Sequence, residues 1–313
     1  MKIRDSVIFN KDFILITSLA FFYFFIFHSF LLLPLHLVNL GATEKVVGFI
    51  MGISGLSTLI LTPSVGYLAD RYGKKIFISS GLLVLSLSTL PFAFLDEINY
   101  MMFFLRIIQG ASFSLFFISA GALIADLSPQ NKKTEAIGVY GVFTVINYAI
   151  APFIGSIIIG KYDFKTYMIY LSMFGITGFL LSLLVKNPSE SNMEKSTSSS
   201  LSYLYYLKNK PSFISILTLF VLGAAFISTL NFISLFSISI EVESFYLYFV
   251  SYTATVLFIR ILLGWVPDKF GKWKVSSLAV LAFGGGILLL AFTGSLTFLI
   301  LASILFGVGH GFA

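Results

Sequence analysis

The sequence GYLADRYGKK, residues 66–75, decides how this chain is organised, because it separates two long apolar runs. Gly66 allows two helices to approach closely, and Gly73 allows a sharp turn. Asp70 can accept hydrogen bonds from the free N–H groups at the start of a neighbouring helix. Basic residues in such a short loop predict that it lies on the cytoplasmic side of a membrane. They are Arg71, Lys74 and Lys75.

A second copy of this pattern occurs in GWVPDKFGKWK, residues 264–274. Gly264, Asp268 and Gly271 have the same spacing as Gly, Asp and Gly in the first copy, and Lys272 follows them. Two copies at corresponding places in two sets of apolar runs indicate an internal repeat. We call these segments the first loop and the second loop. Together they resemble the signature loop of the major facilitator superfamily of transporters.

The composition excludes an ordinary soluble domain. Hydrophobic residues make up 58% of the 313 residues and charged residues only 11%, whereas a soluble domain is about 25% charged. The formal charge of +6 lies in short loops between apolar runs, which indicates the lipid bilayer surface as the partner and not a nucleic acid. The absence of cysteine excludes thiolate metal sites, disulfides and cysteine nucleophiles.

Ten apolar runs predict ten membrane-spanning helices, since each is near the ~20 residues that cross a bilayer. The first run is longer than the apolar core of a secretory signal and has no small-residue cleavage site, so it also predicts a spanning helix. The runs cover 13–38, 46–69, 76–95, 99–126, 135–160, 166–185, 211–240, 244–266, 275–293 and 295–313.

The basic residues predict how these helices are oriented. When the loops are assigned to alternate sides, the side that carries the N-terminus collects most Lys and Arg residues, and the other side has Lys45, Lys161 and Lys165. This asymmetry predicts a cytoplasmic N-terminus in a multi-pass protein of the plasma or inner membrane. Arg106 and Arg260 are the two basic residues that lie within apolar runs.

The predicted fold is an all-α polytopic membrane protein with two six-helix bundles, as the family resemblance implies. A Ser-rich polar segment predicts a linker and divides the chain into 1–186, 187–210 and 211–313. Members of the family usually have twelve spanning helices. By the repeat, Ala313 corresponds to Leu115, in the middle of the fourth run. We therefore expect the second bundle to be incomplete, and the chain to be a fragment or a truncated product.

The resemblance implies a gate built from charged residues. In the family an acid at the end of the fourth helix joins the acid of the first loop and the basic residue after it, which here are Asp126, Asp70 and Lys74. Many members have Arg at the Lys74 position. The competing interpretation is that Asp126 is a solvated acid at a helix end. The repeat also predicts that Asp268 meets the start of the fifth helix, near Thr134 and Glu135.

The fourth run contains LRIIQG, residues 105–110, which resembles the family motif whose Arg is associated with proton coupling. Arg106 and Gln109 share a helix face. A guanidinium within a membrane costs at least ~2.5 kcal/mol unless it finds water or partners, so we expect Arg106 to face a hydrated cavity between the halves. The alternative is an Arg bonded to neighbouring carbonyls. Arg260 is either a pathway residue or extends toward the cytoplasm.

The fifth run contains APFIGS, residues 151–156, which resembles incompletely the Gly-Pro motif of antiporters and drug exporters. Pro152 is expected to kink this helix. His28 is either a proton-binding group or a neutral packing residue. Polar residues within the apolar runs are further candidates for a cavity lining; they are Tyr23, Asn147, Tyr148 and Asn231.

No enzyme motif occurs in the sequence: it has no phosphate-binding loop, no HExxH spacing and no paired carboxylates at membrane depth. We therefore expect no catalytic residues, metal or cofactor. The apolar runs have no Asp or Glu at mid-membrane, which leaves the energy source open, with protons as one candidate. The 36 Phe residues and Pro152 favour export of small amphipathic molecules by alternating access. Import of sugars or other metabolites would need more amides and acids, and a non-transporting scaffold or degenerate transporter fragment is the third hypothesis.

Overall fold

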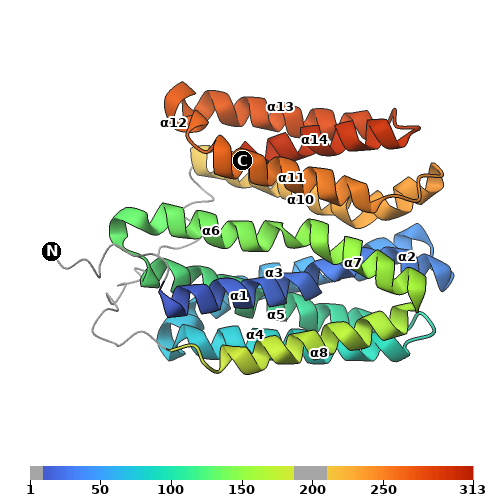
Figure 1. The fold of residues 1–313 in the computed structure, drawn as a ribbon, viewed down its shortest axis with the longest axis horizontal. Coiled ribbons are helices and arrows are strands. Elements are labelled where there is room, and N and C mark those ends of the chain that lie inside the picture. Colours follow the sequence, from blue (N-terminus) through green and yellow to red (C-terminus); the bar gives the residue numbers. More distant parts are fainter. Residues whose placement is uncertain (1–9, 187–209, 313) are drawn as a thin grey trace.

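The computed structural model describes residues 10–186 and 210–312, and the regular elements of these two ranges are all helical. Figure 1 shows the helices running side by side in two groups that follow the sequence. We call residues 10–186 the first half and residues 210–312 the second half. The predicted linker lies outside the described residues except for Lys210, with which the first helix of the second half begins.

Helices of the first half cover all six predicted runs. They are α1 (Lys11–Ser29), η2 (Phe30–Leu32), α2 (Leu33–Asn39), α3 (Glu44–Tyr72), α4 (Lys74–Thr89), η3 (Leu90–Phe94), α5 (Tyr100–Leu127), η4 (Gln130–Lys132), α6 (Lys133–Val145), α7 (Asn147–Lys161) and α8 (Phe164–Ser182). Those of the second half are α10 (Lys210–Ser239), α11 (Tyr246–Leu262), α12 (Val266–Phe270), α13 (Lys272–Leu290) and α14 (Leu296–Phe312).

Eight spans in the described part of the chain are long and apolar enough to cross a membrane. The helices α11 and α14 are also apolar but have 17 residues each. The prediction of an all-α multi-pass membrane protein is therefore confirmed, with eight full-length spans and two shorter apolar helices at the ten predicted positions.

Polar caps define where several helices begin. An Asn or Asp side chain accepts a hydrogen bond from a free N–H group in the first turn, which would otherwise have no partner within the helix. The pairs are Asn10 with Phe13 N (2.8 Å), Asn99 with Met101 N (3.0 Å) and Asp163 with Thr166 N (2.6 Å). These caps start α1, α5 and α8.

Several of the predicted spans are interrupted near a proline, and two of them show the cause clearly. A short 3₁₀ turn separates α1 from α2 just before Pro34, and α6 gives way to α7 at Ile146, upstream of Pro152. Proline lacks the N–H group and its ring clashes with the carbonyl four residues earlier, so the preceding turn distorts. At the second break, Asn147 Nδ2 donates to the Phe143 carbonyl at 2.8 Å.

Small residues bring α3 and α5 into close contact. A Cβ atom added to Gly110 would lie 2.0 Å from the Ser54 carbonyl oxygen. Ser57 Oγ donates to the Ile107 carbonyl at 2.8 Å, and Thr58 Oγ1 donates to the Gly110 carbonyl at 2.9 Å. Close backbone approach and hydroxyl bonds between helices are typical of association within a membrane.

The helices α4 and α8 meet in the same way. Ser172 Oγ donates to the Ser86 carbonyl at 2.9 Å, and Ser182 Oγ donates to Ser79 Oγ at 2.8 Å. A Cβ atom added to Gly175 would lie 2.1 Å from Ser86 Oγ. The first half is therefore fastened by polar contacts between small residues at two separate helix pairs.

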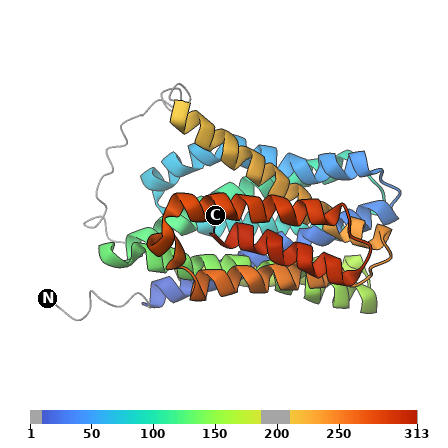
Figure 2. The ribbon, with the colours of Figure 1, turned by 90° about the horizontal axis from the view of Figure 1, so that it is seen from above.

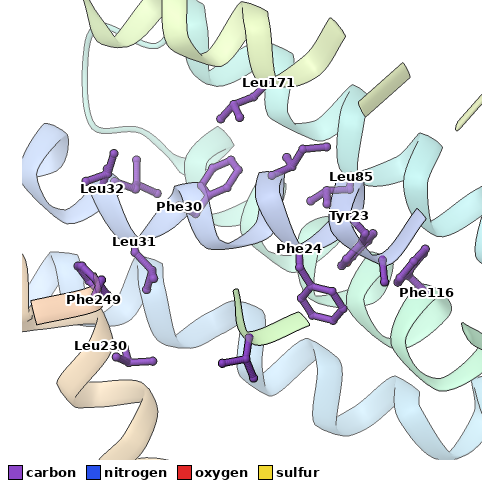
Figure 3. Packing of buried hydrophobic residues seen from close by; sticks show 14 of the residues in the cluster. Tyr23, Phe24, Phe30, Leu31, Leu32, Leu85, Phe116, Leu171, Leu230 and Phe249 are labelled. Carbon is purple, nitrogen blue, oxygen red and sulfur yellow. The ribbon is translucent and has the colours of Figure 1, made fainter. Parts of the chain in front are cut away.

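Aromatic side chains fill the centre of the first half. Tyr23 is fully buried and stacks on Phe116 with ring centroids 4.2 Å apart, and the two rings lie together in Figure 3. Its hydroxyl is 2.9 Å from Ser112 Oγ. The bond satisfies the polar atom of Tyr23 inside the bundle, so this residue packs the first half and does not line the contact between the halves.

We call the end of the bundle that holds the turns at Gly73 and Gly271 the basic end. The two halves contact each other mainly away from this end. The helix α11 packs on α7 and α6, and α10 packs on η2 and α2, where Figure 3 shows Leu230 and Leu31. Exposure along α10 falls from 69% at Leu219 to 0% at Leu230, and Figure 2 shows this helix diverging toward its first residue.

The α3–α5 contact predicts a stability difference between two glycines of α5. Gly110→Ala should lower the free energy of unfolding by about 1–3 kcal/mol, because the new methyl group overlaps the Ser54 carbonyl of α3. Gly121→Ala is the matched control, since a Cβ atom there meets nothing within 4 Å. Thermal unfolding of the purified protein in detergent measures both, and equal melting temperatures would contradict the packing described.

Candidate functional site

The two loops at the basic end share a backbone conformation as well as a sequence pattern. Gly73 has φ +95° and Gly271 has φ +92°, a region that favours glycine. Their N–H groups donate to the carbonyls of Ala69 and Pro267 at 3.0 Å each. Each glycine thus ends one helix and starts the next, so the internal repeat is present in the structure.

The first loop forms a cluster of three charges. Lys74 lies in the first turn of α4 and is 8% exposed, and its ammonium group pairs with Asp126, in the last turn of α5. Asp70 Oδ1 lies 3.5 Å from the same ammonium group, with its side chain 65% exposed. A buried ammonium group is stable only when it is paired. The structure thus brings the predicted trio together, and Asp126 is not an unpaired acid at a helix end.

The loop also contacts α8 and its own helix. Lys75 Nζ donates to the Leu183 carbonyl at 2.8 Å, at the end of α8, where free carbonyl groups attract cations. The Arg71 guanidinium lies 5.4 Å from the ring of Tyr72. Gly66 faces α5, where an added Cβ atom would touch Ile118 at 3.9 Å.

The second loop is exposed, which corrects the expectation that Asp268 meets the start of the fifth helix near Thr134. The Asp268 side chain is 76% exposed and pairs with Lys272 at 3.9 Å. No residue of α12 is buried among those the structure describes. The reason is the arrangement of the halves, which contact each other through α7, α11 and the last turns of α10 and so leave the basic end of the second half undocked. Gly264 packs within its own turn, because an added Cβ atom would lie 3.0 Å from the Arg260 carbonyl.

Arg106 is buried between α5 and α3, with 4% of its surface exposed. Its donors reach four acceptors, which are the carbonyls of Ile50 (3.3 Å) and Met51 (3.3 Å), Ser54 Oγ (2.8 Å) and Gln109 Oε1 (2.9 Å). The guanidinium also lies 5.4 Å from the ring of Phe30, in η2 after the first helix. The expectation of a hydrated cavity between the halves is therefore wrong for Arg106, because the close approach at Gly110 brings α3 carbonyls within its reach.

Rings from five helices meet where the halves contact each other. His28 stacks on Tyr148 with centroids 3.6 Å apart, and Tyr148 lies 5.9 Å from Phe226 and 5.8 Å from Tyr252. Tyr252 Oη is 2.5 Å from His310 Nδ1. We call these five residues, from α1, α7, α10, α11 and α14, the aromatic cluster. Sequence reasoning missed Phe226, Tyr252 and His310 as site residues, because no local pattern links three separate apolar runs.

Several buried polar atoms on these helices have no hydrogen-bond partner among the described residues. They are His28 Nδ1, Asn147 Oδ1, Ser234 Oγ, Tyr248 Oη and Thr253 Oγ1. A buried polar atom left unpaired costs about 1–3 kcal/mol, so such atoms normally bind water or a ligand. Asn231 of α10 is also buried, at 8% exposure. The contact between the halves therefore includes buried polar atoms that a ligand or water can bind.

Arg260 extends from α11 across the contact to α6. A Cβ atom added to Gly141 would lie 3.1 Å from Arg260 Nη1. Gly141 lies about two helical turns before Tyr148 of the aromatic cluster. Arg260 follows Tyr252 on α11 in the direction of the basic end. The structure therefore places the guanidinium at the contact between the halves, beside the cluster.

Pro152 is buried on the side of α7 that packs within the first half. A Cβ atom added to the nearby Gly155 would lie 2.4 Å from Leu32 Cδ1 and 2.6 Å from Tyr167 Oη. Small residues near Pro152 thus allow α7 to pack tightly against η2 and α8.

Comparisons with known proteins agree on one family. A family model described as Major Facilitator Superfamily matches residues 14–313. An uncharacterized MFS-type transporter of Methanocaldococcus jannaschii is 28% identical over 184 residues, which cover 57% of this chain and 47% of that protein. Quinolone resistance protein NorA of Staphylococcus aureus is 30% identical over 177 residues, which cover 54% of this chain and 45% of that protein.

A solved structure shows the same fold. The crystal structure of the nucleoside transporter NupG has a TM-score of 0.78 and 16% sequence identity, and the match covers 97% of this chain and 80% of that chain. The chain spans a little under half of the length of the two curated relatives it matches.

The buried charge cluster at the first loop and the exposed ion pair at the second loop predict unequal effects on the free energy of unfolding. Asp126→Ala should lower the free energy of unfolding by about 1–2 kcal/mol, because it leaves the buried ammonium group of Lys74 with a single, exposed partner. Asp268→Ala breaks the solvated pair with Lys272 and should cost less than about 0.5 kcal/mol. Chemical denaturation in detergent checks the ranking, which fails if the Asp268 variant is the less stable one.

The acceptors around Arg106 predict that lysine cannot replace it. Arg106→Lys should cost about 1–3 kcal/mol of unfolding free energy, because one ammonium group cannot reach acceptors that surround a planar guanidinium. Arg71→Lys is the control, since Arg71 is exposed at the first loop. Melting temperatures that are equal for the two variants would show that the planar network is not needed.

Proposed function

This chain belongs to the major facilitator superfamily of membrane transporters, and from that premise we propose that it exports small amphipathic molecules by alternating access. The supporting observation is the unequal contact between its halves. The halves pack through α7, α11 and the last turns of α10, whereas the second loop at the basic end is exposed. Two halves that contact each other at one end of the bundle can rotate as rigid bodies until they contact each other at the opposite end. Alternating access proceeds by this rocking motion.

The orientation of the chain follows from its basic residues. We infer that the basic end faces the cytoplasm and that the protein lies in the plasma or inner membrane, because Lys74, Lys75, Lys272 and Lys274 gather there. The described arrangement is then the state open toward the cytoplasm. Residues 1–186 and 211–313 act as the two moving bodies in this proposal.

The cluster of Asp70, Lys74 and Asp126 acts as the cytoplasmic gate in this proposal. Lys74 holds both carboxylates, and the 65% exposed side chain of Asp70 can accept further hydrogen bonds from a helix start in the second half when the basic ends close. Such a contact exists in only one of the two states, so it shifts the equilibrium between them without changing the fold.

The aromatic cluster supports an amphipathic substrate. Its rings come from both halves and offer apolar faces, while His28 and Asn147 keep buried polar atoms free to bind a ligand. A binding region built from rings with few amides fits export of amphipathic molecules better than import of sugars. The similarity to NorA, a quinolone resistance protein, points in the same direction. Protons are the proposed coupling ion, with His28 as the candidate coupling group.

Transport in vesicles tests the direction. Inside-out membrane vesicles that contain the protein, energised by a proton gradient, should accumulate a fluorescent quinolone above vesicles without the protein. Right-side-out vesicles with a fluorescent nucleoside supplied on the outside serve as the comparison, because import of polar metabolites is the alternative. Nucleoside uptake without quinolone accumulation would establish an importer, and neither activity would establish the non-transporting scaffold or degenerate fragment.

The gate predicts a rate effect in the same assay. Asp70→Asn should insert normally and slow quinolone accumulation, because loss of a carboxylate at a helix start removes about 0.3–2 kcal/mol from one of the two states. Asp96→Asn is the matched control, because Asp96 is an exposed acid in a loop at the other end of the bundle. Equal rates in the wild-type protein and the Asp70→Asn variant would remove Asp70 from the gate.

A further inference from the structure

Arg260 has no acidic partner among the described residues. The ion pairs in that part of the chain involve Asp70, Asp126 and Asp268, and each of these acids pairs with a lysine at a loop. The acid on α6, Glu135, is exposed and lies more than one turn from Gly141, toward the basic end. An arginine stays charged at any physiological pH, so within the described ranges 10–186 and 210–312 the contact between the halves holds a cation without a counter-ion.

The guanidinium is positioned for a ligand that also touches the aromatic cluster. Its Nη1 atom lies against α6, 3.1 Å from where a Cβ atom of Gly141 would be. Arg260 is partly exposed, so its donors are accessible. Arg260 lies about two helical turns from Tyr252 on α11, and Gly141 lies about two turns before Tyr148, so the guanidinium and rings from both halves lie along the same contact.

We propose that Arg260 and the aromatic cluster bind an amphipathic organic anion, with its carboxylate on the guanidinium of Arg260 and its aromatic ring against Tyr148, Phe226 and Tyr252. This inference rests on the proposed function and narrows its substrate class. A planar guanidinium binds a carboxylate through two parallel hydrogen bonds, and the ring of the ligand packs against aromatic edges and faces.

The charge balance favours an anion over a cation. Aromatic faces alone attract cations as well as neutral rings. The unpaired guanidinium beside the cluster repels a second positive charge, and the five residues of the cluster include no carboxylate that would offset this repulsion. The ligand that best completes the site carries one negative charge and one ring system.

Binding of three naphthalene compounds to the purified full chain in detergent tests the proposal. The probes are 2-naphthoate, 2-naphthamide and 2-naphthylmethylammonium, which share a ring system and differ in charge. Isothermal titration calorimetry should give 2-naphthoate at least about tenfold higher affinity than the other two, as expected for a charge-assisted hydrogen bond. Arg260→Gln should abolish the preference and leave 2-naphthamide affinity within about twofold.

Two glycines of α6 provide a second test that leaves the Arg260 residue itself unchanged. Gly141→Leu should displace the guanidinium, because a Cβ atom there already lies 3.1 Å from Nη1, and so should weaken 2-naphthoate binding about tenfold. Gly138→Leu should leave the affinity unchanged, because a Cβ atom at Gly138 meets nothing within 4 Å. The proposal is overturned if the cationic probe binds as tightly as the anion, if none of the probes binds, or if both leucine variants behave alike. If 2-naphthoate binds but the vesicles transport nothing, only the proposed function is overturned. If the vesicles transport the quinolone but the protein shows no preference for the anion, only this inference is overturned.

Discussion

Helices in a bilayer gain nothing from burying apolar side chains against one another, because lipid is equally apolar, and this constraint governs the whole structure. Association must come from close backbone approach and from polar contacts between helices. Gly110 on α5 and Gly175 on α8 provide such contacts in the first half. Gly309 on α14 provides one in the second half, where an added Cβ atom would lie 2.4 Å from Phe283 Cβ.

The contact between the halves is built differently from the contacts within them. Within each half, hydroxyl groups bond across helices, as Ser57 does to α5 and Ser251 does to Ser303. Between α7 and α11 the described residues make ring contacts, such as Phe153 with Tyr246, and no hydrogen bond. Rings can shift past one another at small cost, whereas a broken buried hydrogen bond is expensive. A rocking motion requires two halves that are each held together by hydrogen bonds and that contact each other through side chains able to shift.

The fold and the first loop could be predicted from the sequence because their signals are local. Apolar length marks the spans, and a glycine at a fixed spacing from Asp70 marks the turn that Gly73 makes. The trio with Asp126 followed from family resemblance. The surroundings of Arg106, the exposure of Asp268 and the Tyr252 pair with His310 could not be predicted. These three features depend on which helices face each other and on which of the two arrangements the halves adopt. The spacing of residues along a single helix predicts neither the pairing of the helices nor the arrangement of the halves.

Distances between the halves at both ends of the bundle test the account most directly. The chain has no cysteine, so spin labels can be attached at Tyr72→Cys with Trp273→Cys for the basic end, and at Tyr162→Cys with Ile238→Cys for the other end. Pulsed electron–electron double resonance in lipid measures both distances. A transported substrate should shorten the distance at the basic end and lengthen the distance at the other end. Distances at both ends that stay fixed, or that change together in the same direction, would contradict alternating access about the α7–α11 contact.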